Sequence, residues 1–94
     1  MGNSGKVRIL PAPHHFNPST IIKYSLGKAV HVSLKIYNLL GIEIATLVNN
    51  QQGAGVYTIP FSISGINSGF SSGVYFYRLE AGSFTATKKL VYLK

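Results

Sequence analysis

The feature that most constrains this chain is a run of alternating residues near its centre. The run VHVSLKIYN divides into an apolar parity and a polar or amphipathic one: Val30, Val32, Leu34 and Ile36 against His31, Ser33, Lys35 and Tyr37. Successive side chains of a β-strand point to opposite faces of the sheet, whereas one face of a helix repeats about every 3.6 residues. The run therefore predicts a strand over 30–38 with one buried face.

Neighbouring runs extend this prediction to an all-β fold. LLGIEIATLV follows a short loop in which Gly41 can adopt positive φ, so 42–48 should return along 30–38 as a hairpin. Its alternation breaks between Ile44 and Leu47, which predicts a β-bulge that turns both inward. Six to seven short strands with glycine turns are typical of an antiparallel immunoglobulin-like β-sandwich. The other strands are expected over 19–26, 56–63, 74–80 and 83–93, the last two joined at Ala81 and Gly82.

Two residues refine the predicted sandwich. Pro60 lies inside 56–63 and has no N–H to donate, so that strand should lie at a sheet edge. Tyr75, shortly after Gly73, stands where such folds carry a tyrosine corner, although an ordinary core aromatic fits equally well. The predicted core is the apolar parity of the strands: Ile22, Tyr24, Val32, Leu34, Ile36, Ile44, Leu47, Tyr57, Ile59, Phe61, Tyr75, Tyr77, Leu79 and Phe84.

Length and composition predict one domain held by apolar packing. The chain has 94 residues and no cysteine, so disulfides cannot stabilise it. We expect 16–94 to form the domain, and 1–15 to be an N-terminal linker or artificial extension with room for a short first strand. No stretch of about twenty apolar residues is present, which argues against direct membrane insertion. The start MGNSGKVRIL lacks the apolar region of a signal peptide.

The charge balance is strongly basic. Nine lysines and arginines face two acidic residues, giving a formal charge of +7. Such a surface attracts nucleic acids and acidic partners. The basic residues are spread singly or as one pair along the predicted strands, where a solvent-facing lysine also hinders edge-to-edge pairing. We therefore interpret them as solvated strand faces and expect no nucleic-acid partner.

The reactive side chains argue against an enzyme. The only acids are Glu43 and Glu80, and no pattern places them across a substrate. Aspartate and cysteine are absent, and no G-x-S-x-G motif supplies a nucleophilic serine. His14 and His15 are neighbours on an extended segment and point opposite ways, so together with His31 they do not predict a metal site. No glycine-rich phosphate loop leads into a helix, and we expect no cofactor.

Four segments in order resemble one family of bacterial domains. They are FNPSTIIKYSLGKAVHVSLKIYNLLGIEIATLV, GAGVYTIPF, SSGVYFYRLEAGSFTATKK and LVYLK. FNPST before a strand, IYN-x-x-G, G-x-Y-F-Y-R-L and a final KK-x-x-x-x-K occur together at suitable spacings over about residues 16–94. In these features the chain is similar to the type A C-terminal sorting domain of proteins exported by the type IX secretion system of Bacteroidetes-like bacteria.

The resemblance implies a non-catalytic β-sandwich carried behind an upstream cargo domain in a larger precursor. Its implied partners are the outer-membrane secretion translocon and a sortase-like surface peptidase that removes the domain after export. The implied location is the periplasm in transit, then the cell surface or the medium. Five positions match the family pattern: Gly73, Tyr75, Lys88, Lys89 and Lys94. For Gly73 and Tyr75 a structural role is the stronger interpretation. For the three lysines we favour recognition by the translocon.

Departures from the family pattern leave two alternatives open. PHHF stands in place of the usual Pro-Asn-Pro before phenylalanine, Gly27 replaces a proline after YSL, and the loop SGINSGFSSG is long. The long loop is closer to the immunoglobulin-like domain of flagellar hook-capping proteins, which implies a structural module. The other alternative is a carbohydrate-binding module that uses Tyr37 and Tyr92 as exposed stacking surfaces.

The last predicted strand contains a conflict of parity. Phe84, Ala86, Leu90 and Tyr92 can share a buried face only if Lys88 shares it. A bulge at Lys88 and Lys89 would release both amines from the core. We therefore expect 90–93 to anchor the strand and the lysines beside it to be exposed.

Overall fold

The structure is a computed structural model that describes residues 6–10, 15–16, 19–62 and 73–92. Within these residues the chain forms eight β-strands and no helix. The short first strand lies within 1–15, and the start of the domain at residue 16 stays a prediction. The strands are β1 (Val7–Ile9), β2 (His15–Phe16), β3 (Ser19–Leu26), β4 (Val30–Tyr37), β5 (Glu43–Gln52), β6 (Gly55–Ser62), β7 (Gly73–Ala81) and β8 (Phe84–Tyr92).

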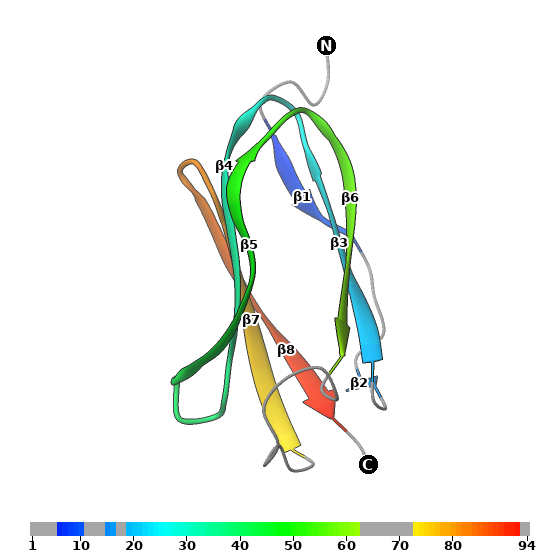
Figure 1. Ribbon diagram of the computed structural model, residues 1–94, viewed down its shortest axis with the longest axis vertical. Coiled ribbons are helices and arrows are strands. Elements are labelled where there is room, and N and C mark those ends of the chain that lie inside the picture. Colours follow the sequence, from blue (N-terminus) through cyan, green and yellow to red (C-terminus); the bar gives the residue numbers. More distant parts are fainter. Residues whose placement is uncertain (1–5, 11–14, 17–18, 63–72, 93–94) are drawn as a thin grey trace.

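The strands form the two facing sheets of a β-sandwich (Figure 1). One sheet has the order β1-β3-β6 and the other the order β2-β8-β7-β4-β5. The pairings are antiparallel apart from the short parallel pairing of β2 with β8. With β1, β3 and β6 as strands A, B and E, and β4, β5, β7 and β8 as C, C′, F and G, the order is that of an immunoglobulin-like sandwich. The predicted fold class is confirmed, and so is the edge position of Pro60 on β6.

The core consists of the inward-facing residues of the central strands. Three side chains at its centre, Val32, Leu34 and Ile36 of β4, are completely buried, as the alternation predicted. Five predicted core residues are only partly buried, because they lie on edge strands or at the end of the sandwich: Ile44, Leu47, Tyr57, Ile59 and Phe84. Five buried residues lie outside the predicted core: Leu26, Val48, Ala81, Leu90 and Tyr92. Burial of the last two agrees with the expected anchoring of the strand by 90–93.

The β4–β5 hairpin contains the predicted irregularity in a different form. Its register shifts twice, between Leu34 and Lys35 and between Ile36 and Tyr37, so Leu47 and Ile44 of β5 have no partner directly opposite. Each shift is a bulge, which bends the hairpin and increases its twist. Val48 opposite Leu34 is buried in place of Leu47. The bulges therefore turn the end of the hairpin away from the other strands, as its lower part in Figure 1 shows.

A two-residue turn joins β7 to β8. Ala81 pairs with Phe84, so the turn is Gly82-Ser83, one residue later than predicted. Gly82 has φ +61°, and glycine at the first central position is typical of a type II′ hairpin turn. A Cβ on Gly82 would lie 2.9 Å from Cγ2 of Val30, so the turn packs closely against the start of β4.

A side-chain hydrogen bond links the two sheets. The buried Tyr24 of β3 donates its hydroxyl to Oε1 of Gln52 on β5 at 2.6 Å. Its ring stacks on Tyr57 of β6, with centroids 5.4 Å apart. Burial raises the pKa of Tyr24, and it also raises the pKa of Tyr77 on β7. Both hydroxyls therefore stay protonated at neutral pH.

Candidate recognition surface

The β7–β8 hairpin carries four of the five residues that the sequence proposed for recognition. Gly73 begins β7 opposite Tyr92, with φ +154°, a value that L side chains rarely adopt. Tyr75 is buried and pairs with Leu90. Tyr75 is therefore part of the core, whereas Gly73 is half-buried with no atom within 4 Å of the place of a Cβ; the tyrosine-corner role of the Tyr75 hydroxyl stays a prediction. Lys94 lies outside the described residues.

Lys88 and Lys89 are both exposed on β8, as expected, but the bulge proposed to expose them is absent. The register is continuous, with Lys88 opposite Tyr77 and Lys89 opposite Phe76. Lys88 therefore faces inward, between the half-buried Ala86 and the buried Leu90, and still reaches water. Among the described residues, the facing sheet has only the three-residue β1 on that side, which leaves the lysine room to reach solvent. A lysine stem can cover apolar surface there while its amine stays solvated.

Among the described residues, the outer edge of β8 is unpaired beside these lysines. β2 pairs only with Val91 and Tyr92, so among the described residues no strand pairs with the outer edge of β8 before Val91. An open edge offers backbone N–H and C=O groups to an added strand. The two lysines project to opposite faces of this edge, because adjacent residues of a strand alternate. An added segment would therefore meet a cation on each face.

The two acids of the chain are already engaged by neighbouring cations. Glu43 lies 3.4 Å from the amine of Lys35, and Glu80 lies 4.0 Å from the guanidinium of Arg78. A hydrogen bond from Thr46, at 2.8 Å, and the amine of Lys35 together lower the pKa of Glu43. Since the chain has no other Asp or Glu, every further lysine has no acidic side chain left to pair with. The basic residues other than Lys35 and Arg78 therefore give the surface its positive charge.

The described residues offer no evident catalytic or metal centre. Nε2 of His31 lies 2.9 Å from Oδ1 of Asn49, an exposed contact between neighbouring strands. His14 is outside the described residues, and among those described no three His, Cys, Asp or Glu side chains gather to hold a metal ion. None of the described segments is a helix that could span a membrane.

The stacking surface proposed for carbohydrate binding is not formed. Tyr92 is only 7% exposed, because the inward parity of β8 places it in the core. Tyr37 is partly exposed, and the guanidinium of Arg78 lies over its ring, 5.3 Å from the centroid. The carbohydrate-binding alternative required both tyrosines at the surface, and for Tyr92 that is wrong. The burial of Tyr92 agrees instead with the expected anchoring of the strand by 90–93.

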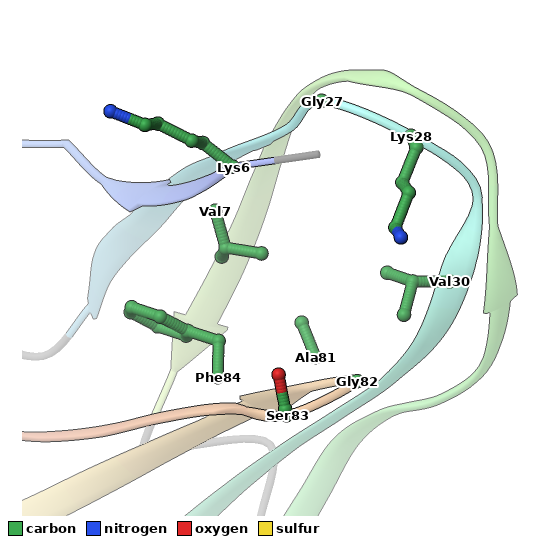
Figure 2. Close-up of a pocket in the computed structure, with 9 residues that line it drawn as sticks. All are labelled: Lys6, Val7, Gly27, Lys28, Val30, Ala81, Gly82, Ser83 and Phe84. Carbon is green, nitrogen blue, oxygen red and sulfur yellow. The ribbon is translucent and has the colours of Figure 1, made fainter. Parts of the chain in front are cut away.

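A cavity of about 390 Å³ opens at the other end of the sandwich, beside the β7–β8 turn (Figure 2). Its walls include Val7, Val30 and Phe84, and Lys28 holds its amine next to Val30, whereas the amine of Lys6 points away. Ser83 is the lining hydroxyl in Figure 2, and no histidine or carboxylate lines the cavity to activate it. The cavity therefore provides no nucleophilic centre.

A comparison with protein families identifies the sandwich. A family model described as the secretion system C-terminal sorting domain matches residues 9–93. This chain belongs to that family. The domain is thus a C-terminal sorting signal of a secretion system, and the family is one of export signals rather than enzymes. No protein in the curated set matches the sorting domain.

Solved structures support the fold of the sorting domain and nothing more specific. The periplasmic chaperone SfaE matches with a TM-score of 0.64 and 12% identity over 92% of this chain and 56% of that one. An FMN-binding β-glucuronidase from Faecalibacterium prausnitzii matches with a TM-score of 0.61 and 14% identity over 98% of this chain and 12% of that one. The CARDB domain of PF1109 from Pyrococcus furiosus matches with a TM-score of 0.56 and 13% identity over 93% and 92%. The sorting domain spans only a minor part of the glucuronidase and about half of the chaperone.

Proposed function

We propose that this domain is a folded export label of the type IX pathway, recognised by the outer-membrane translocon through the open edge of β8. Lys88, Lys89 and Lys94 supply the charged contacts, and Gly73 and Tyr75 hold the hairpin in shape. The observation that carries the proposal is a pair of adjacent exposed lysines in a member of the sorting family, on opposite faces of a strand edge that no described residue pairs with before Val91. An extended partner segment can bind such an edge by strand addition.

The proposal also includes the fate of the precursor. The upstream cargo passes the outer membrane with the sorting domain attached, and a sortase-like peptidase at the surface then removes the domain. The cargo stays at the surface or enters the medium. Mass spectrometry of an exported reporter should therefore show that the 94-residue chain has been lost. A reporter that keeps the chain after export would contradict the cleavage step alone.

Substitution of the two lysines tests recognition. A reporter fused to the complete chain is expressed in a bacterium with this pathway, and surface exposure is measured by protease shaving of intact cells. Lys88→Ser with Lys89→Ser should lower surface reporter about tenfold or more, the loss typical of a central contact. The matched control, Lys6→Ser with Lys28→Ser, removes the same charge at the cavity end and should leave export unchanged. Equal export of the two double variants would contradict the role of β8.

Deletion of 90–94 would be a less selective test of recognition. It removes Leu90 and Tyr92, which are 3% and 7% exposed, from the core. Loss of export after that deletion would follow from unfolding as well as from loss of a contact. The lysine pair avoids this difficulty, because both side chains are exposed and surface substitutions usually change stability little.

A further inference from the structure

The turn between β4 and β5 is an exposed apolar tip. It comprises residues 38–42 and contains no charged side chain. Its side chains Leu39, Leu40 and Ile42 are 67%, 82% and 56% exposed. Among the described residues, the other exposed large apolar side chains lie singly on β3 and β6. Three such side chains on one turn form an apolar patch of the kind that marks a protein or membrane contact.

The backbone of the tip satisfies its own hydrogen bonds. Oδ1 of Asn38 accepts bonds from the N–H groups of Leu40, at 2.9 Å, and Ile42, at 3.0 Å. The N–H of Gly41 donates to the carbonyl of Asn38 at 2.9 Å, and the N–H of Asn38 donates to the carbonyl of Ile42 at 3.0 Å. An unpaired backbone group is costly to move out of water, because lipid offers no partner in its place. Since these donors are paired within the turn, the tip can leave water at low cost.

The sheet that carries the tip also brings two lysines to its base. Tyr37, the last residue of β4, pairs with Phe76 of β7, which in turn pairs with Lys89 of β8. Two strand spacings therefore place the backbone of Lys89 about 10 Å from that of Tyr37, on the same outer face of the sheet. Lys88 is also exposed, on the other face of β8. Figure 1 shows the tip and the end of β8 at the same, lower end of the sandwich.

The charge around the base of the tip is positive. Glu43 begins β5 opposite Tyr37, and the amine of Lys35 lies 3.4 Å from it, so this pair adds no net charge. The other acid of the chain lies beside an arginine, which leaves no acidic side chain for Lys88 and Lys89. Their backbone lies about one Debye length from the base of the tip at about 0.1 M salt. Basic residues at this range from a membrane strengthen its binding when the lipids are anionic.

We propose that the tip inserts its aliphatic side chains into an anionic lipid surface, with Lys88 and Lys89 attracted to the phosphate groups of the lipids. The tip reaches the headgroup level and does not cross the bilayer, as in other amphipathic segments that lie on membranes. Tyr37 is partly exposed at the base of the tip, where an aromatic ring with a polar end suits the boundary between lipid and water. Lipid binding is an activity beyond recognition by the translocon. It holds the domain at a membrane surface.

Protein occupants fit the tip less well than lipid does. A second copy is opposed by the formal charge of +7 that each chain carries. Three side chains also offer far less than the roughly 800 Å² per partner of a stable protein interface. A groove in another protein would cover the base of the tip as well, yet lysine is depleted in protein interfaces, whereas it is a usual partner of lipid phosphate.

Co-sedimentation of the purified 94-residue chain with vesicles tests the proposal. Vesicles of phosphatidylcholine and phosphatidylglycerol in equal parts should bind the chain, and Leu39→Ser with Leu40→Ser should weaken binding about tenfold or more. Leu39→Met with Leu40→Met keeps the apolar area and should bind like the unsubstituted chain. Lys88→Ser with Lys89→Ser should weaken binding to the mixed vesicles by about fivefold per lysine. It should leave binding to pure phosphatidylcholine unchanged.

A charge control separates insertion of the tip from adsorption of a basic chain. Lys6→Ser with Lys28→Ser removes the same charge at the cavity end, which lies opposite the tip (Figure 1, Figure 2). β4 spans about 23 Å between Val30 at the cavity and Tyr37 at the base of the tip, more than twice the Debye length of about 10 Å. This variant should therefore bind like the unsubstituted chain.

A fluorescent label measures insertion directly. The chain has no cysteine, so Leu40→Cys accepts one environment-sensitive dye at the tip. Its emission should shift to the blue on the mixed vesicles. The dye on Val56→Cys should not shift, because Val56 is 66% exposed near the cavity end of the sandwich. Urea unfolding of every variant confirms that it is folded before vesicles are added.

The outcomes are independent of the sorting function, because vesicles contain no translocon. A folded chain that does not bind the mixed vesicles, or that binds equally well with the leucine pair replaced by serine, overturns the proposal and leaves the sorting function standing. Equal losses for the two lysine variants show adsorption of a basic chain alone and also overturn it. A blue shift without vesicles, with a dimer in light scattering, assigns the tip to a second copy instead. A blue shift on the mixed vesicles that is confined to the tip supports the proposal, whether or not the domain directs export.

Discussion

Gly82 in the β7–β8 turn should be the least replaceable glycine among those described, because two separate effects act there. Its φ of +61° costs a residue with a Cβ about 1–2 kcal/mol. The new Cβ would also lie 2.9 Å from Cγ2 of Val30, and relieving such overpacking typically costs about 1–3 kcal/mol more. Gly82→Ala should therefore lower the free energy of unfolding by about 2–5 kcal/mol, a large share of the about 5–15 kcal/mol of a small domain.

Gly41 provides the matched control. Its φ is +85°, but no atom lies within 4 Å of the position that a Cβ would take, so Gly41→Ala should show the backbone cost of about 1–2 kcal/mol alone. Urea unfolding of both variants, with unchanged m-values, gives the comparison. Combining Gly82→Ala with Val30→Ala removes the contact, so the double variant should be less destabilised than the sum of the singles by about 1 kcal/mol or more. Equal losses for Gly82→Ala and Gly41→Ala, or strict additivity with Val30→Ala, would refute the reasoning.

Further predictions concern the hydrogen bonds and the core. Tyr24→Phe should cost about 1 kcal/mol, because it removes the bond to Gln52 that joins the sheets. Burial raises the pKa of Tyr24. The stability linked to its protonated form is therefore complete below the unfolded tyrosine pKa of about 10 and is lost as pH rises further. Urea unfolding above that pH should show a smaller loss of stability for Tyr24→Phe. Thr46→Val should raise the pKa of Glu43, measured by NMR titration, because the strongest lowering contact is removed. Because the pKa of Glu43 is lowered in the folded state, its contact with Thr46 stabilises the fold at neutral pH, and this stabilisation is lost as pH falls through the folded pKa. An unchanged titration of Glu43 in Thr46→Val would contradict the assignment. Leu34→Ala, at a completely buried site, should cost about 2–5 kcal/mol in the same urea assay.

The period of two predicted the sheet faces well in the central strands and less well at the ends. Val32, Leu34 and Ile36 are buried as the pattern requires, because β4 has a paired strand on each side. Hydrophobicity alone could not show that Tyr57 and Ile59 are half covered, since that depends on β6 being an edge. Pro60 was the one sequence signal of that position.

The candidate site was predicted in part. The sequence placed Lys88 and Lys89 at the surface for a wrong reason, a bulge, whereas the register is continuous and Lys88 reaches water from an inward-facing position. It did not predict the exposed apolar turn at 38–42 between β4 and β5, because the apolar run LLGIEI resembles the start of a buried strand. Asn38 followed by Gly41 was the available signal for an ordered turn, but only burial shows that Leu39 and Leu40 face water.

The architecture explains how a domain without an evident reactive centre can act as a signal. Among the described residues, the sandwich holds a strand edge that is unpaired before Val91, with Lys88 and Lys89 on its two faces. The proposed contact depends on tertiary structure, because this edge needs β7 beside β8. The label that we propose is therefore the folded domain rather than a linear peptide.

Surface export of a reporter fused to the complete chain, compared between a strain with the type IX pathway and the same strain lacking its outer-membrane translocon, tests the central claim most directly. The measured quantity is the fraction of reporter that external protease removes from intact cells. The account predicts surface reporter in the first strain and periplasmic retention in the second. Equal surface exposure in both strains, or retention in both, would contradict it.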